Sequence, residues 1–247
     1  MEHAIFISNL KNLRFVDKSR FNRLYFGNEF CEYLIPKIEQ IKKILDYCEK
    51  EDIELSFVTA AFLKDSDIIE IEKILNILPK NTEVIFNDYG LLEFIKKRNL
   101  IPIQGRVLTI ITRDPRKVSS KSEKEYMMLN SLTENYQKKM IELGVNRFEL
   151  DNVKQGYKLK ALDNVKTSIY YPYVFYNITR NCVFYDKKNK THNCEKDPIS
   201  ANLDGYKMYI KGNVQYYINN NKPETKNWNT DRLVYMPTFP NDNSDLN

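Results

Sequence analysis

The sequence predicts an α/β protein with a parallel, TIM-barrel-like (β/α) sheet, incomplete or distorted, that leads into a β-rich C-terminal part. Three observations predict this fold. Short apolar segments alternate with amphipathic ones in units of about 30 residues, which favours parallel strands covered by helices. The pattern changes after Asp151 to a tyrosine-rich, alternating one. Five or six strand–helix units are too few for a regular eightfold barrel.

The expected elements of the first part follow from the spacing of apolar residues and from helix-end signals. Strands are expected over residues 23–27, 54–59, 83–86, 101–111 and 145–150. Helices are expected from Pro36 through Cys48, from Asp65 or Ser66 to Leu78, through 91–95, and from a Ser122–Glu125 capping box to Met140.

The C-terminal part is expected to be rich in strands from about residue 165. Residues 166–179 predict one long strand, 207–218 a hairpin that turns at Gly212 and Asn213, and 232–236 a last strand. No repeat or linker divides the 247 residues, so we expect a single domain over 1–240 and a disordered tail over 241–247.

Composition narrows the class of protein. The net charge of +5, from 38 basic and 33 acidic residues, is small and spread out, so it does not favour nucleic acid as a partner. The alternation of basic and aromatic residues over 207–217 is typical of an ordinary sheet. No apolar run reaches the roughly 18 residues of a membrane span. The first residues lack the pattern of a signal peptide, and a cytoplasmic location is the expectation.

The four cysteines fall into two groups. Cys48 lies on the apolar face of a predicted helix, where a small buried hydrophobe is expected. Cys31 and Cys182 follow predicted strands, and Cys194 joins them if the loop between 182 and 194 folds back. Because the carboxyl ends of parallel strands share one edge, we expect these three thiols on one face. Thiolates gathered there suit a soft metal or an iron–sulfur cluster, whereas burial as hydrophobes is the alternative.

Acidic residues at strand ends are the candidates for acid–base chemistry. Asp88 follows one strand and Glu149 ends another, and together they form the candidate catalytic pair. The alternative for each is a helix cap or a solvated carboxylate. The chain has neither a His-Glu-x-x-His zinc helix nor a Gly-x-Ser-x-Gly nucleophile elbow, and its two histidines are His3 and His192.

Several segments, in their order and spacing, resemble the peptidase U32 family over roughly residues 5–200. The closest likeness is to the short, single-domain branch related to the iron–sulfur proteins of oxygen-independent ubiquinone biosynthesis. The segments are Tyr25–Glu32, Val84–Gly90, Gly105–Arg106, Arg113–Arg116 and Thr179–Cys182. They include Asn87, Arg106 and Arg180, which we add to the expected site residues.

The resemblance implies a barrel-like fold that holds a 4Fe-4S cluster on four cysteines. Cys31, Cys182 and Cys194 match the first three ligands. The fourth falls near Pro198, where this chain has no cysteine. Asp197, His192 or an outside ligand could substitute, and a three-thiolate cluster with an open iron or a lost cluster are the alternatives.

Three functions are consistent with the resemblance. The first is an iron–sulfur accessory or redox component of an oxygen-independent hydroxylation or modification system. The second is a collagenase-like peptidase that uses Asp88 and Glu149. The third is a non-catalytic subunit with a degenerate cluster site, paired with a partner of the same family. For that partner, residues 170–173 offer aromatic side chains, unless they form a core strand.

Overall fold

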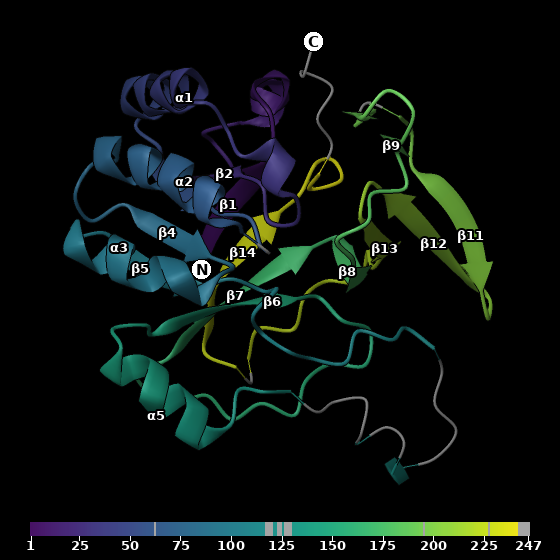
Figure 1. The fold of residues 1–247 in the computed structure, drawn as a ribbon. Coiled ribbons are helices and arrows are strands. Elements are labelled where there is room, and N and C mark those ends of the chain that lie inside the picture. The colour runs from purple at the N-terminus through teal and green to yellow at the C-terminus, as the bar shows by residue number, and fades with distance from the viewer. Residues whose placement is uncertain are drawn as a thin grey trace.

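A computed structural model describes residues 1–61, 63–116, 121–122, 125, 130–194, 196–226 and 228–241. The chain forms a closed barrel of eight strands, each parallel to both neighbours (Figure 1). In spatial order they are β1 (Glu2–Ile7), β14 (Thr230–Tyr235), β7 (Lys166–Tyr171), β6 (Arg147–Asp151), β5 (Ile101–Gln104), β4 (Glu83–Phe86), β3 (Glu54–Val58) and β2 (Arg23–Gly27).

Helices cover the outside of this barrel. They are α1 (Ile38–Glu51), α2 (Asp65–Ile77), α3 (Leu92–Lys97) and α5 (Glu134–Glu142), with 3₁₀ turns η1 (Leu10–Phe15), η2 (Glu32–Leu34) and η3 (Tyr89–Leu91). Apolar residues at helical spacing, such as Ile41 and Ile44 of α1, are fully buried against outward-facing strand residues. This outer layer forms the largest apolar core of the described chain and fixes the strands in register.

Inward-facing side chains fill the barrel in layers, as the two-residue period of strands dictates. On β6 the three inward residues are Arg147, Glu149 and Asp151, from the amino end to the carboxyl end. The apolar residues of the interior include Val58, Ile85, Ile103 and Tyr170. The barrel is therefore a packed core with charged groups at three depths.

A second, antiparallel sheet stands beside the barrel, on the right in Figure 1. Its strands, in order, are β11 (Ile199–Leu203), β12 (Tyr206–Lys211), β13 (Val214–Ile218) and β8 (Tyr173–Ile178). A short hairpin of β9 (Tyr185–Asp186) and β10 (Thr191–His192) precedes β11. Phe175 and Tyr216 of this sheet pack on Phe30, which follows β2, so the sheet covers the carboxyl end of the barrel.

The predicted TIM-barrel-like fold with a β-rich C-terminal part is confirmed. The barrel closes with eight strands because β1, which was not expected, joins the five strands of the first part together with β7 and β14, which were expected as strands of the C-terminal part. The small sheet occupies the connection from β7 to β14, where a regular barrel has a helix, and this is the distortion.

Two predicted elements have different bounds. The helix expected over 122–140 is not continuous: Ser122 and Glu125 are helical, but α5 is a separate helix that begins at Glu134, where the Thr133 hydroxyl accepts a hydrogen bond from the Tyr136 amide and caps it. Asn130 pairs instead with Ile111 in an isolated bridge, and residues 123–124 and 126–129 of the prediction lie outside those described. The strand expected over 166–179 is two strands: β7 in the barrel and β8 in the small sheet, separated at Pro172.

The aromatic segment 170–173 belongs to the core rather than to a free surface. Tyr170 is fully buried in the barrel, and the rings of Tyr171 and Tyr173 pack at a tilt against those of Tyr235 and Phe239. The disordered tail predicted over 241–247 is wrong for its first residue, Asn241. Asn241 is buried and accepts a hydrogen bond from the Tyr216 hydroxyl. Residues 242–247 lie outside those described. None of the described helices has the length and apolar character needed to cross a bilayer.

Candidate functional site

Three of the four cysteines line one small cavity beside the carboxyl end of the barrel. Its volume is about 10 Å³, which is the room of about one water molecule. We call it the cysteine cavity; its lining residues are Cys31, Leu34, Cys182, Phe184, Cys194, Lys211, Gly212, Asn213 and Asn241. The expected convergence of these three thiols, which lie far apart in the sequence, is thus found in the structure.

Each cysteine is positioned by a different segment. The loop after β2 carries Cys31, whose backbone amide donates to the Asn28 side-chain oxygen at 3.0 Å. Next to Cys182, the Val183 amide donates to the Gly212 carbonyl at 3.0 Å, which ties this segment to the turn between β12 and β13. Cys194 follows the β9–β10 hairpin. The cavity therefore forms where the barrel, the hairpin and the small sheet meet.

Burial determines the protonation state of the Cys31 thiol. Desolvation raises the pKa of Cys31 to about 12, and the proximity of Cys194 and Cys182 adds to this shift. A thiol with such a pKa is protonated at neutral pH and is a poor nucleophile. Cys48 also has a pKa raised to about 12 by burial, but it lines a separate cavity of about 660 Å³ near the amino end of β3. Its expected role as a core residue agrees with its burial in the outer apolar layer.

The donor set of the cysteine cavity fits a soft metal or an iron–sulfur group, because thiolates are the usual ligands of both. The volume of the cavity, about 10 Å³, is too small for either group. Among the described residues, no group of three or more His, Cys, Asp or Glu side chains stands ready to hold a metal ion. A four-iron cluster is larger than one water molecule, so the segments with Cys182 and Cys194 would have to move away from Cys31 to admit it.

The two substitutes expected for the missing fourth cysteine do not line the cavity. The His192 ring lies between Tyr33 and Tyr185, with ring centroids 4.3 and 4.8 Å away. Its Nδ1 atom is buried and has no hydrogen-bond partner among the described residues. Asp197 is exposed. Within the described chain, therefore, the cavity offers three thiols and no fourth acidic or imidazole ligand.

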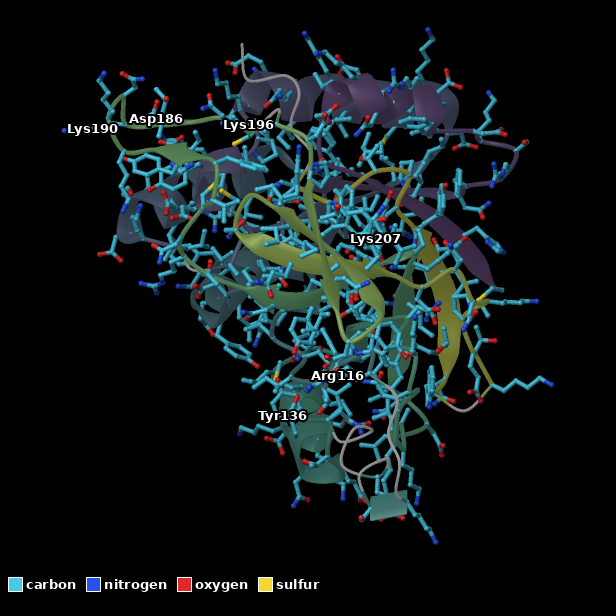
Figure 2. All side chains as sticks on the ribbon, turned by 90° about the vertical axis from the view of Figure 1, so that its right-hand side faces the viewer. Arg116, Tyr136, Asp186, Lys190, Lys196 and Lys207 are labelled. Carbon is cyan, nitrogen blue, oxygen red and sulfur yellow. The ribbon has the colours of Figure 1, made fainter. Side chains whose placement is uncertain are left out.

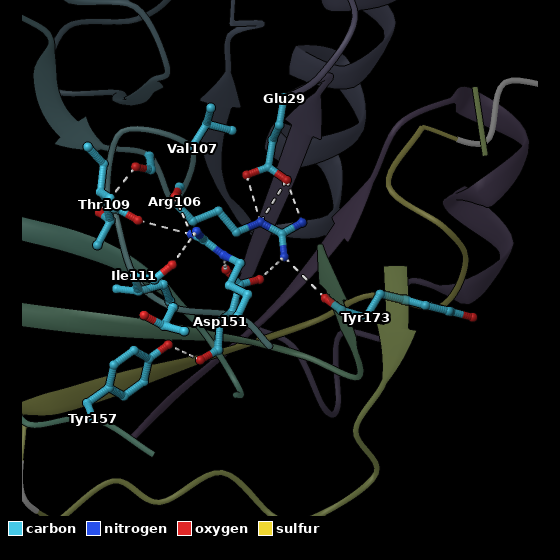
Figure 3. Close-up of polar contacts among 12 residues, drawn as sticks. Glu29, Arg106, Val107, Thr109, Ile111, Asp151, Tyr157 and Tyr173 are labelled. Carbon is cyan, nitrogen blue, oxygen red and sulfur yellow. Dashed lines mark hydrogen bonds and ion pairs between the residues drawn. The ribbon is translucent and has the colours of Figure 1, made fainter. Parts of the chain in front are cut away.

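Charged side chains close the carboxyl end of the barrel (Figure 3). The Arg106 guanidinium donates to both oxygens of Glu29, at 2.6 to 3.1 Å, and to Asp151 at 2.7 Å. Arg113 donates to the other oxygen of Asp151 at 2.7 Å and to the Arg106 carbonyl at 2.7 Å. We call these four residues the mouth network.

The mouth network is buried and its charges are matched. Arg106, Glu29 and Asp151 have side chains with no exposed area. Burial alone lowers the pKa of Arg106, but the charges of Glu29 and Asp151 outweigh it and raise that pKa above its usual value. The Arg106 guanidinium also lies 4.4 Å from the centre of the Tyr170 ring. This network fills the place where barrel enzymes have their active site.

Glu149 is the next inward-facing residue of β6, deeper in the barrel than Asp151, and its environment differs from that of the mouth network. The Tyr25 hydroxyl donates to its Oε1 atom at 3.1 Å, and its Oε2 atom has no hydrogen-bond partner among the described residues. Desolvation raises the pKa of Glu149 to about 7, although the charges of Arg232 and Arg147 act in the opposite direction. Glu149 has no exposed area, so a polypeptide substrate does not reach it in this structure.

Asp88, the other member of the predicted catalytic pair, caps η3. Its carboxylate accepts a hydrogen bond from the Gly90 amide at 2.8 Å, the cap that we gave as the alternative. No hydrogen-bond partner is shared between Asp88 and Glu149 in the described chain.

The remaining predicted site residues have distinct places. The side-chain amide of Asn87 donates to the Thr59 carbonyl at 2.8 Å, and its oxygen accepts from the Val107 amide at 3.3 Å, so it joins two strand-end loops. Arg180 is exposed, just before the cysteine cavity in the sequence. Arg106 is the centre of the mouth network.

Sequence reasoning missed the polar wall of the cysteine cavity. Lys211, Asn213 and Asn241 are all more than nine-tenths buried there. The predicted turn at Gly212 and Asn213 was the available signal, because a turn that packs back on the core buries its neighbours. It also missed Glu29 as a partner of Arg106, although both lie in segments singled out for the family resemblance.

Comparison with known proteins adds little to this picture. No family model and no curated protein matches the chain. Among solved structures, the chain is similar to one described as the copper homeostasis protein CutC of Streptococcus agalactiae, at 12% identity and a TM-score of 0.43. The match covers 69% of this chain and 87% of that one.

Proposed function

We propose that this chain is an iron–sulfur accessory or redox protein whose cluster is held by Cys31, Cys182 and Cys194. The observation that carries the proposal is the meeting of these three thiols at one cavity, from segments up to about 160 residues apart in sequence. The resemblance to the U32 family supports the same three ligands. It also suggests the setting, an oxygen-independent hydroxylation or modification system.

When bound, a four-iron cluster supplies one-electron transfer at a potential that the surrounding protein adjusts. Cys31, Cys182 and Cys194 would supply its thiolate ligands. The Asn28 side chain holds the backbone of Cys31 in place, and the Gly212 carbonyl holds the segment of Cys182. Cys31 would have to lose its proton to act as a ligand, because burial raises its pKa to about 12.

The peptidase alternative has less support from the geometry. Glu149 is buried in the barrel, Asp88 caps a 3₁₀ turn, and Cys31 is a protonated thiol. None of them has the arrangement of a base beside an exposed nucleophile. The buried ion pairs of Arg106 with Glu29 and Asp151 also occupy the carboxyl end of the barrel in the described chain.

Anaerobic reconstitution with ferrous iron and sulfide tests the proposal. We expect the unaltered protein and a Cys48→Ala variant to turn brown and to hold iron and sulfide at the content of a four-iron cluster. Cys31→Ala, Cys182→Ala and Cys194→Ala should each lose most of that iron. Cys48→Ala is the matched control, because Cys48 is equally buried but lies at another cavity.

Two results would contradict the proposal. The first is a colourless, iron-free protein after reconstitution. The second is iron bound equally by the unaltered protein and by all three cavity variants, which would place the metal elsewhere. Cleavage of gelatin by the pure protein, lost in Asp88→Ala, would favour the peptidase instead.

A further inference from the structure

The cysteine cavity is the right size for a bond between two of its own thiols. Its volume of about 10 Å³ leaves the room of about one water molecule, so the three cysteine side chains that line it surround a very small space. Cys31 and Cys194 also belong to one apolar cluster, whose third member is Leu34. In a disulfide the two Cβ atoms lie about 3.8 Å apart, only slightly closer than atoms in ordinary apolar contact. A small shift of either segment would therefore join Cys31 to Cys194.

The three thiols differ in their separation and in their exposure. The charge of Cys194 has a larger effect on the pKa of Cys31 than the charge of Cys182 has, which agrees with a shorter separation between Cys31 and Cys194. Cys31 and Cys194 are both buried, whereas Cys182 is partly exposed. Cys182 is thus the thiol of the cavity that a reagent from solution reaches first, and Cys31 and Cys194 are the pair behind it.

A bond between Cys31 and Cys194 would join two distant parts of the chain. Cys31 lies on the loop after β2, and Cys194 follows the β9–β10 hairpin. The four strand residues of that hairpin are half-buried or exposed, and Asp186 and Lys190 lie at the outer edge of the molecule (Figure 2). The bond would tie this hairpin to the barrel, which limits how far the hairpin can move away.

We propose that Cys31 and Cys194 form a reversible disulfide, and that Cys182 passes oxidation to them from a low-molecular-weight disulfide. This inference goes beyond the proposed function and requires no metal. All four cysteines carry reduced thiols in the structure, so the structure shows the reduced state of this pair.

The oxidation takes three exchange steps. The thiolate of Cys182 attacks one sulfur of the small disulfide, forms a mixed disulfide with it and releases one small thiolate. Cys194 then attacks the Cys182 sulfur and releases the second small thiolate. Finally, Cys31 attacks the Cys194 sulfur, and Cys182 leaves as a thiolate. The protons of Cys31 and Cys194 pass to the two small thiolates, so two protein thiols lose two electrons and the small disulfide becomes two thiols.

Oxidised glutathione tests this exchange in metal-free, fully reduced protein. The reaction is stopped by acid and alkylation, and linked peptides are identified by mass spectrometry after digestion without reductant. We expect the unaltered protein and the Cys48→Ala control to form the bond between Cys31 and Cys194. Cys182→Ser should form the same bond about tenfold more slowly, because its two remaining cavity thiols are buried. Cys31→Ser should stop at a bond between Cys182 and Cys194.

Hydrogen exchange measures what the bond does to the hairpin. Backbone amides over 185–192 should exchange more slowly in the oxidised protein and return to their earlier rates after treatment with dithiothreitol. Amides of α1, which lies away from the cavity, should exchange at the same rate in both states.

The outcomes separate this inference from the proposed function. If glutathione attached to Cys182 while Cys31 and Cys194 stayed unlinked, the disulfide would be ruled out. Equal rates of bond formation in the unaltered protein and in Cys182→Ser would rule out the role of Cys182. A protein that forms the bond but takes up no iron would overturn the proposed function alone. A protein that takes up iron but never links Cys31 to Cys194 would overturn this inference alone.

Discussion

The barrel buries two polar clusters, which differ in whether each carboxylate is hydrogen-bonded to a guanidinium. In the mouth network, each carboxylate faces a guanidinium: Glu29 pairs with Arg106, and Asp151 pairs with both Arg106 and Arg113. One strand position deeper, Glu149 has one hydrogen bond from Tyr25 and one oxygen with no partner in the described chain. Burial is complete for both Glu29 and Glu149.

The difference shows how pairing decides what a buried acid can do. Burial raises the pKa of Glu29, and the charge and hydrogen bonds of Arg106 act against that rise, so Glu29 forms a structural tie with its counter-ion. Glu149 accepts a hydrogen bond from one neutral donor, and burial raises its pKa to about 7. Both clusters are buried in the described chain, so the contrast between Glu29 and Glu149 comes from pairing and not from exposure.

Removing the centre of the mouth network should have the largest effect. Arg106→Leu leaves Glu29 and Asp151 buried without their main counter-ion, so we expect a loss of about 3–5 kcal/mol in the free energy of unfolding. Urea unfolding followed by the fluorescence of Trp228, the single tryptophan, measures this loss.

Arg116→Leu is the matched control for that experiment. Arg116 pairs with Asp114, but its side chain is 49% exposed, and such surface pairs contribute about 0–1 kcal/mol. Equal destabilisation by the two substitutions would show that the mouth network is not the structural tie that its burial indicates.

Glu149 should make stability depend on pH. Its pKa rises from 4.5 in the unfolded chain to about 7 in the folded one, so the folded state holds the proton more tightly. The resulting stability is complete below pH 4.5 and is lost as the pH rises through 7. A shift of this size corresponds to roughly 3 kcal/mol. Glu149→Gln should remove this contribution, so its free energy of unfolding falls less between pH 5 and pH 8.

The measurement is a series of urea unfolding curves from pH 5 to pH 8, each compared with the unaltered protein. Glu142→Gln serves as the exposed control, because the Glu142 side chain is 65% exposed and should not alter the pH dependence. Parallel curves for Glu149→Gln and the unaltered protein would mean that folding does not raise the pKa of Glu149.

The sequence predicted local elements well and long-range closure poorly. The apolar spacing of α1 and α2 and the short apolar runs of β3 and β4 are local signals, and each element appeared near its expected bounds. Closure depends on β1, β7 and β14 pairing across the whole chain, and no local pattern indicates such partners.

The same distinction applies to the candidate site. The general rule that parallel strands end at one edge of a sheet was enough to predict that Cys31 and Cys182 lie on one face, and both line the cysteine cavity. It could not mark Lys211 as buried, because burial there depends on how the β12–β13 turn packs against a loop from another part of the chain. Nor could it distinguish Asp88 as a cap from Glu149 as an isolated acid, since both simply follow apolar runs.

Asp88 gives the smallest expected effect and the sharpest test between a cap and an acid–base group. Asp88→Ala should cost about 1 kcal/mol in the free energy of unfolding, because the Gly90 amide loses its acceptor. Asp88→Asn keeps an acceptor oxygen and should restore most of that loss. Urea unfolding measures both, and iron uptake should be unchanged in both. If Asn failed to replace Asp, and an activity of the protein disappeared in both variants, Asp88 would be acting through its charge or its proton.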